Sequence, residues 1–365
     1  MRLLGFHAEN FRNITEADIS FSEGVNLFLG DNAEGKTNAV EGIYLFARGK
    51  SFRSVADRDL VRFGEQGFSL DIRYADRTGE HTLSYTYQDG SRRRNKDGYK
   101  LSGVNEMIGN FRAVLFTPDD LSMVKGGPEG RRAFLNVAIA QCYPQYMKLY
   151  ADFKRAQEER NCLLKNAARG FGVDMSQIEA WSESLSCYAA EVYIFRRDYT
   201  KKLHRLAYPT LLSLSDGREE GIFSYKCDLP CDIQDKKEIE DAYFRLFTSD
   251  IRREMAAGCT LFGPTRDDLD ITVNGVPARN FASQGQQRSV VLALKYAEGE
   301  VLRGVIGEEP VYLFDDVLSE LDDRRRAFIL SEQDKKQMIL TACSGEGWQG
   351  VSPHIIRVKE GAYRE

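Results

Sequence analysis

The feature that most constrains the fold of this chain is segment 30–37, GDNAEGKT, which fits the pattern G-x-x-x-x-G-K-S/T. An apolar stretch at 25–29 precedes it, and the residues from 38 onward have helical spacing. A strand, a glycine-containing loop and a helix in this order are typical of a phosphate-binding P-loop. A chance match to the motif alone occurs in about one chain of this length in fifty, and the flanking context makes it rarer.

Each residue type in this segment has a physical task. Two glycines let the backbone N–H groups curl onto a polyphosphate, and the N-terminus of the following helix adds partial positive charge. The lysine reaches the β- and γ-phosphates, and the threonine offers a hydroxyl to Mg²⁺. The sequence therefore predicts a nucleoside triphosphate site made of Gly30, Asp31, Asn32, Ala33, Glu34, Gly35, Lys36 and Thr37.

Composition argues against a membrane-spanning or disulfide-rich protein. The 365 residues are 42% hydrophobic and 29% charged, as in a soluble globular chain with room for two or three domains. No run approaches the roughly 18 apolar residues that cross a bilayer, and an acid interrupts the N-terminus before a signal-peptide core could form. Seven dispersed cysteines argue against a disulfide framework. We therefore expect a cytoplasmic protein without a membrane partner.

Hydrophobic periodicity divides the chain into two kinds of sequence. Apolar alternation or short apolar runs predict strands at 3–9, 17–22, 25–29, 67–75, 80–88, 113–116, 222–227, 269–273, 310–314, 337–341 and 354–358. Helical spacing dominates from 129 to about 214, and it returns at 238–257 and 289–302. We predict an α/β domain, residues 1–125 and 259–365, that is split in sequence around a helical lobe at 126–258.

A second candidate element is the apolar run that ends in Asp315 and Asp316. An α/β sheet places its ligand at the carboxyl ends of its strands, so Asp315 is expected to hold Mg²⁺ through water. Asp316 stands where a general base could polarise the attacking water, which makes it the candidate catalytic residue. The alternative is a buried strand that ends in a solvated Asp-Asp turn, but the P-loop upstream favours an active site.

A third element, Ser283-Gln-Gly285-Gln286, stands directly before an apolar helix. A hydroxyl and bare N–H groups at a helix start offer hydrogen bonds to an anion. Taken alone, such a motif is more often an ordinary helix N-cap. Its position ahead of the Asp-Asp strand favours an anion site.

The order of these motifs, completed by Leu318-Ser-Glu-Leu-Asp322, resembles the ABC-type ATPases of the SMC branch. Within that branch, essentially the whole chain is similar to the RecF recombination-mediator family. The segments that carry this resemblance are 10–13, 128–135, 263–269, 282–288, 293–298 and 313–322. The resemblance implies an ABC-type P-loop ATPase head domain split around a mainly helical lobe.

In that superfamily the nucleotide lies between two subunits, so the resemblance implies an ATP-dependent homodimer. Ser283, Gly285 and Gln286 would bind the γ-phosphate of the opposite subunit, and Asp322 would bridge the two sites. Arg12 and Asn13 would lie near the base and the ribose. ATP and Mg²⁺ are then the implied cofactors, and a weak, DNA-stimulated ATP hydrolysis would release the dimer.

The resemblance also implies a biological context. Members of the family bind DNA near single-strand gaps and help to load the recombinase. The implied function is therefore in recombinational repair and replication restart, with other recombination-mediator proteins as partners.

The chain departs from the family pattern at some positions. Thr265 and Asn136 stand where His and Asp are common. Thr341-Ala-Cys follows the last core strand, where many ABC ATPases have a histidine. This departure argues against γ-phosphate sensing by a histidine. The best positional candidate for the loop between the lobes is 117–119.

The formal net charge of −5 carries no overall basic footprint, so any DNA contact depends on local clusters. One cluster is predicted as a basic loop, and another recurs every fourth residue on one helix face. Such clusters are more often solvated faces than phosphate tracks. The candidates for sequence-independent, salt-sensitive DNA contacts are Arg92, Arg93 and Arg94 in the loop, and Arg197, Lys201 and Arg205 on the helix.

Other functions share part of this motif set. An ATP-binding subunit of a transporter, or an ATP-clamped scaffold for a non-DNA partner, would contain the same nucleotide motifs. The large helical lobe and the flanking motifs argue against the transporter. A GTPase needs Asn-Lys-x-Asp, and in Asn95-Lys96-Asp97 the aspartate comes one place early. A nuclease of the SMC kind needs a separate metal-carboxylate cluster, which the sequence does not suggest.

Overall fold

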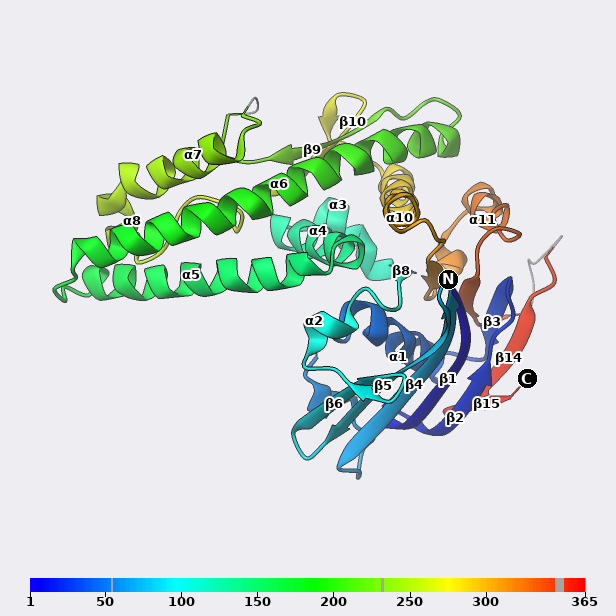
Figure 1. Ribbon diagram of the computed structural model, residues 1–365. Coiled ribbons are helices and arrows are strands. Elements are labelled where there is room, and N and C mark those ends of the chain that lie inside the picture. The colour runs from blue at the N-terminus through cyan, green and yellow to red at the C-terminus, as the bar shows by residue number, and fades with distance from the viewer. Residues whose placement is uncertain (54, 231–232, 345–350, 365) are drawn as a thin grey trace.

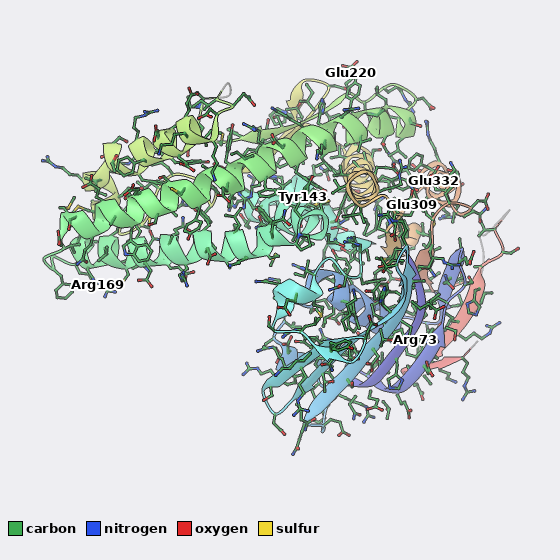
Figure 2. All side chains as sticks on the ribbon, viewed as in Figure 1. Arg73, Tyr143, Arg169, Glu220, Glu309 and Glu332 are labelled. Atoms are coloured by element: carbon green, nitrogen blue, oxygen red, sulfur yellow. The ribbon has the colours of Figure 1, made fainter. Side chains whose placement is uncertain are left out.

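The computed structural model describes residues 1–53, 55–230, 233–344 and 351–364. Figure 1 shows a sheet-rich body, which holds both ends of the chain, and a long helical arm that extends away from it. Arg169, which follows α5, lies at the far tip of the arm (Figure 2). The mixed α/β class predicted from the sequence is confirmed.

A mainly parallel sheet forms the centre of the body. Its strand order is β15-β14-β3-β13-β12-β8, and only β15 is antiparallel to its neighbour. These strands are Ala362–Arg364, His354–Lys359, Val25–Leu29, Met338–Ala342, Val311–Phe314 and Ala113–Phe116. Side chains of β8 alternate between an apolar core on each face of the sheet, which explains why the central strands are continuous apolar runs.

An antiparallel sheet covers one side of the body. Its order is β2-β1-β4-β5-β6-β7, and its strands are Ile14–Ser20, Arg2–Phe11, Gly67–Asp76, Gly79–Gln88, Ser91–Lys96 and Tyr99–Lys100. Helix α1, Lys36–Arg48, shares one apolar core with this sheet and with the parallel sheet. A Cβ atom at Gly42 would lie 2.6 Å from the Phe6 ring, so the glycine permits α1 to approach β1 closely.

The helical arm begins after β8. Two long antiparallel helices, α5 and α6, form its length, and α7 lies along α6 (Figure 1). The arm helices are α3 (Ser122–Lys125), α4 (Pro128–Cys142), α5 (Gln145–Ala168), α6 (Met175–Leu214), α7 (Lys236–Ser249) and α8 (Ile251–Ala257). The predicted helix at 238–257 is therefore two helices, because the side chain of Asp250 caps the start of α8.

The arm and the body are tied together by the segment after α8. Strand β10, Asp268–Val273, pairs with β9, Gly221–Lys226, and with the short β11, Val276–Pro277. Helix α9, Ala278–Phe281, leads into α10, Gln284–Ile306, which packs against both α6 and β8. The two-lobe division with a boundary at 258 stays a prediction, since β9 and β10 lie on opposite sides of that boundary and pair with each other.

Short elements complete the chain. They are α2 (Val104–Met107), α11 (Asp323–Leu330) and the 3₁₀ turns Asp57–Leu60, Pro118–Leu121 and Leu318–Glu320. Among the residues that the structure describes, no helix is both long and apolar enough to cross a bilayer.

Candidate nucleotide site

Segment 30–37 connects β3 to α1 in the arrangement predicted from the sequence. A Cβ atom at Gly30 would lie 2.2 Å from the carbonyl oxygen of Val358, so no side chain fits there. Gly35 has a φ of 119°, and a Cβ atom there would lie 2.8 Å from the Asn13 amide oxygen. Both glycines are therefore required by the backbone path of the loop.

The Lys36 side chain is buried inside the loop. Its Nζ donates to the carbonyl oxygens of Gly30 at 2.6 Å and Asp31 at 2.9 Å. It also lies 3.4 Å from Sγ of Cys343, whose sulfur in turn lies 2.9 Å from the Asn32 amide oxygen. The loop's own carbonyl groups thus hold the ammonium group where a phosphate would meet it.

The strand-end acids lie beside the loop. Thr37 Oγ1 donates to Asp315 Oδ1 at 2.8 Å, so these two residues, 278 positions apart in sequence, touch. Burial raises the pKa of the Asp315 carboxyl to about 6, against the hydrogen bond from Thr37, which lowers it. A buried carboxylate with this tendency is stabilised in its charged form by a nearby cation.

The donor set fits Mg²⁺. The Thr37 hydroxyl and the Asp315 carboxylate are hard oxygen ligands, and Mg²⁺ in nucleotide sites uses one or two such protein groups together with phosphates and waters. In the described part of the chain, no three His, Cys, Asp or Glu side chains form a self-sufficient metal cluster.

Asp316 has a left-handed backbone conformation, with a φ of 53°. Its N–H donates to Oγ1 of Thr341 at 2.8 Å, and the same hydroxyl lies 3.2 Å from Asp316 Oδ1 and 3.3 Å from Asp315 Oδ1. Thr341 is the last but one residue of β13, next to β12 in the sheet. One buried hydroxyl therefore orients both acids.

Arg12 and Asn13 occupy the turn between β1 and β2, and both are already bonded to the chain. The Arg12 guanidinium makes two hydrogen bonds, at 2.8 and 2.9 Å, to the carboxylate of the buried Glu41. The Asn13 amide nitrogen donates to the Glu34 carbonyl at 3.1 Å, and its oxygen accepts from Asn38 at 2.7 Å. These contacts place both residues at the P-loop, and their contact with base or ribose stays a prediction.

The last hairpin of the body also contacts the loop. Gly361 N–H donates to the Glu34 carbonyl at 2.8 Å, and the Glu360 N–H bonds the Glu34 carboxylate. Tyr363 OH donates to the Gly35 carbonyl at 2.9 Å. Strand β14 pairs directly with β3. The loop is therefore held from both ends of the sequence.

The Ser283 motif lies apart, at the exposed N-terminus of α10. Ser283 Oγ accepts from the Gln286 N–H at 3.3 Å, and Gln286 Oε1 accepts from the Ser283 N–H at 2.9 Å, which is a reciprocal capping box. Among the described atoms, the one nearest to a Cβ atom at Gly285 would be an Arg325 guanidinium nitrogen at 3.6 Å. This chain alone therefore leaves room for a side chain at Gly285, unlike at Gly30.

Asp322 caps α11, and an arginine links it to the Ser283 motif. Arg325 pairs with the Asp322 carboxylate. The same guanidinium donates to the Gly285 carbonyl at 2.9 Å and to Ser289 Oγ at 2.7 Å. The residue predicted to cross a subunit interface is thus coupled to the predicted γ-phosphate motif through one side chain.

Sequence reasoning missed several residues of this site. Arg53 donates to Asn38 at 3.1 Å and to Glu41 at 3.4 Å. Burial raises the pKa of Asp315, and the positive charge of Arg53 opposes part of that rise. Glu41 also accepts from the Ser51 hydroxyl. A glutamate on the apolar face of the predicted helix was the available signal, because a buried carboxylate needs cationic partners.

The prediction that Arg92, Arg93 and Arg94 lie in a loop is wrong, because these residues belong to strand β6. Arg92 pairs with the Asp57 carboxylate, and the Arg94 guanidinium lies 4.8 Å from the Tyr85 ring centroid. Alternate residues of a strand face opposite sides. Arg92 and Arg94 therefore have structural partners on the core side, and Arg93 faces away.

The other predicted cluster lies on α6. Lys201 and Arg205 are exposed, whereas the Arg197 side chain is only 12% exposed and pairs with Asp198 at 2.8 Å. Arg197 also donates to the Ile233 carbonyl at 3.1 Å and lies 5.4 Å from the Tyr193 ring centroid. The shared helix face exists, but its three cations have different environments.

Segment 95–97, which resembled a guanine-recognition motif, makes structural contacts. Asp97 accepts from the Thr82 N–H at 2.7 Å and lies 2.8 Å from His81 Nδ1. Lys96 Nζ donates to the Asn110 side chain at 2.9 Å. These contacts fix the β6–β7 turn and support no base recognition.

The fold and the P-loop site together define a class of protein. The family model described as the RecF/RecN/SMC N terminal domain matches residues 3–360. A solved SMC head domain from Pyrococcus furiosus, 17% identical, shares the fold with a TM-score of 0.55 over 100% of this chain and 95% of that one. The chain is therefore a P-loop head of the RecF/RecN/SMC type.

Closer relatives narrow the class. The chain is 34% identical over 366 residues to the DNA replication and repair protein RecF of Lacticaseibacillus casei (strain BL23), covering 99% of each chain. It is 35% identical over 351 residues to the protein of that name from Geobacillus kaustophilus (strain HTA426), covering 95% of this chain and 94% of that one. The chain belongs to the RecF family.

A solved structure agrees with this assignment. It is described as the recombination mediator protein RecF with ATP in the RecFOR pathway. Its TM-score to this chain is 0.93 at 30% identity, and the match covers 100% of this chain and 97% of that one.

Proposed function

We propose that this protein binds ATP and DNA in recombinational repair and replication restart. ATP joins two copies, the dimer binds DNA at single-strand gaps and junctions and assists recombinase loading, and slow hydrolysis resets it. The observation that carries the proposal is the contact between Thr37 and Asp315, with Asp316 held beside them, in a chain similar to RecF proteins over its whole length.

ATP and Mg²⁺ are the proposed cofactors. The N–H groups of segment 30–37 and the Lys36 ammonium would bind the phosphates. Thr37 and Asp315 would hold Mg²⁺, which would neutralise charge on the phosphates as the terminal phosphoryl group leaves. Arg12 and Asn13 would lie at the nucleoside end, where the Arg12–Glu41 pair fixes the turn.

Hydrolysis would depend on Asp316. Its carboxylate would accept a proton from the attacking water, and Thr341 would hold it in place through the backbone N–H. The left-handed backbone at Asp316 turns the chain sharply after β12, which is the kind of local strain that occurs at functional sites.

The proposed homodimer would complete the site. Ser283, Gly285 and Gln286 would meet the γ-phosphate held by the partner subunit, and Asp322 would bridge the two sites. Two observations support this arrangement. Ser283 is exposed at the N-terminus of a 23-residue helix, which attracts anions, and Gly285 has no steric reason within its own chain to lack a side chain.

DNA would be bound through phosphates. Lys201 and Arg205 are exposed on one face of α6, and no ion pair engages either of them among the described residues. Arg93 faces away from the core on β6, whereas Arg92, Arg94 and Arg197 are held by structural contacts. Recombination-mediator proteins and a second copy of this chain are the proposed protein partners.

The proposal is tested by fluorescence anisotropy with gapped and continuous duplex DNA, with and without ATP·Mg²⁺, at two salt concentrations. We expect tight binding that requires ATP and weakens steeply with salt. No DNA binding under any nucleotide condition would overturn the proposal. It would instead favour the alternative, an ABC-type ATP-binding subunit or an ATP-clamped scaffold for a non-DNA partner.

A further inference from the structure

A cavity of about 230 Å³ lies between the middle of α6 and strand β9. Its walls come from α6 through Tyr193, Arg197, Thr200, Lys201 and His204, and from β9 and the residue after it through Phe223, Ser224, Tyr225 and Cys227. Nothing in the nucleotide site uses these residues. Lys201 is an exposed residue of α6 that also lines the cavity.

The chemistry of the cavity wall combines aromatic rings with cations. Tyr193 and Tyr225 have ring centroids 5.9 Å apart, and the Arg197 guanidinium lies over the Tyr193 ring. Lys201 and His204 add basic groups one turn further along α6. None of the described residues that line the cavity is acidic. A flat, anionic ligand matches this combination.

One buried group of the wall lacks a partner. Thr200 is 2% exposed, and its Oγ1 makes no hydrogen bond to the residues that the structure describes. Burying a hydroxyl without a partner is unfavourable, so such groups usually meet water or a ligand. The Oγ1 atom is buried from solvent in this conformation, so the Thr200 side chain would have to rotate about χ1 to offer its hydroxyl to a base edge, which has both hydrogen-bond donors and acceptors.

The size of the cavity fits a single nucleobase. An apolar cavity of about 150 Å³ accommodates a benzene ring, and this cavity is larger than that. It is also placed next to Lys201, with Arg205 one turn beyond, where a phosphate outside the cavity would be neutralised. This arrangement explains why Arg197 is largely buried, because its side chain forms part of the cavity wall and does not contact DNA phosphates.

We propose that this cavity receives one unpaired base of a DNA strand, while Lys201 and Arg205 bind the adjoining phosphates. This inference rests on the proposed DNA-binding function and refines it. Stacking on aromatic and guanidinium planes is tolerant of sequence. A base that is paired in a continuous duplex cannot enter, so the cavity would let the protein distinguish a gap from intact duplex.

The test compares affinities for gapped and continuous duplex DNA in the presence of ATP·Mg²⁺, using 2-aminopurine in the gap to report base environment. Cys227→Phe would obstruct the cavity from the position directly after β9, on the side that Phe223 and Tyr225 face, and Thr200→Leu would fill it from within. Ile222→Phe is the matched control, because Ile222 is exposed on the opposite face of β9 and does not line the cavity.

We expect the wild type to bind gapped DNA more tightly than continuous duplex. In the two cavity variants the ratio of these two affinities should fall at least about fivefold, which corresponds to the lower end of a base-stacking contribution. The affinity of the variants for continuous duplex should not change, and the Ile222→Phe control should keep the wild-type preference for gapped DNA. Melting temperatures check that Thr200→Leu folds, and Cys227→Phe provides an independent variant at a half-buried position.

Two results would overturn the proposed base-binding role of the cavity and leave the proposed function standing. One is a wild type that binds DNA without preferring gaps, and the other is a gap preference that both variants retain. The second would leave the cavity to a side chain of a protein partner. A wild type that binds no DNA would overturn this inference together with the proposed function.

Discussion

Lys36 and Ser283 are both expected to contact a γ-phosphate, yet one side chain is buried within the folded chain and the other is exposed. Lys36 is 4% exposed, and two carbonyl groups and a thiol surround its ammonium. Ser283 is exposed, and among the residues that the structure describes its side chain bonds only within its own helix start. One half of the site is assembled by the folded chain, and the other half presents donors outward.

The two halves of the site therefore differ in what they need in order to bind a phosphate. The P-loop half is ordered before the ligand arrives, so little conformational entropy is lost on binding. The Ser283 half can gain its contacts only from another molecule. We therefore expect substitutions in the first half to act on a single subunit, and substitutions in the second half to act on association.

The largest expected effect comes from Asp316→Asn. Loss of the proposed general base should lower the turnover number about 10²- to 10⁴-fold and leave ATP affinity nearly unchanged, because the backbone contact to Thr341 remains available. Steady-state phosphate release and nucleotide titration measure the two quantities. Turnover within threefold of the wild type would remove Asp316 from the proposed role.

Lys36→Ala should weaken ATP binding by a single subunit about a hundredfold, which corresponds to about 2.7 kcal/mol. The substitution removes a charged donor to the phosphates. Titration with a fluorescent ATP analogue, at concentrations below dimerisation, measures the change. Lys50→Ala is the matched control, since Lys50 is an exposed lysine just beyond the same helix. Equal affinities of the two variants would contradict a phosphate contact.

Ser283→Arg should abolish ATP-induced dimerisation and spare ATP binding by the monomer. The bulky cation occupies the place of a phosphate contact but does not reach the P-loop of its own chain. Sedimentation velocity with and without ATP measures the association. A dimer that forms at wild-type concentrations would show that the two halves do not meet across subunits.

Arg325→Ala should have a smaller effect, about three- to tenfold on ATP-induced dimerisation. The exposed α11 would lose its link to Gly285 and Ser289, while Asp322 would keep its capping bond to the backbone. Arg325→Lys should recover part of the loss, because it retains the charge but not the fork geometry. Unchanged dimerisation in Arg325→Ala would mean that the two motifs act independently.

Much of the P-loop half could be predicted from the sequence because its signals are local. The glycine spacing at 30–37 and the acids at the end of an apolar run both depend on neighbouring residues, and the strands that carry them are confirmed. The contact between Thr37 and Asp315 joins residues 278 positions apart. It followed only from the general rule that ligands gather at the carboxyl ends of parallel strands.

The remaining features depend on tertiary partners that no local pattern reveals. Arg12 and Arg53 share the buried Glu41. Arg325 contacts Gly285, 40 positions earlier in the chain, and thereby joins two motifs. Consecutive arginines at 92–94 hide the alternation of strand β6, because its core-facing cations pair with Asp57 and Tyr85 instead of contacting water.

The hairpin formed by β14 and β15 has a consequence for how the protein is made. A ribosome releases segment 354–364 more than three hundred residues after the P-loop, yet Gly361 and Tyr363 hold that loop, and β14 borders β3. A nascent chain that has emerged as far as the arm has a P-loop strand with an open edge and a loop without these clamps. Nucleotide binding should therefore require that segment 354–364 has been synthesised, so that a chain truncated before this segment would not join a dimer on ATP.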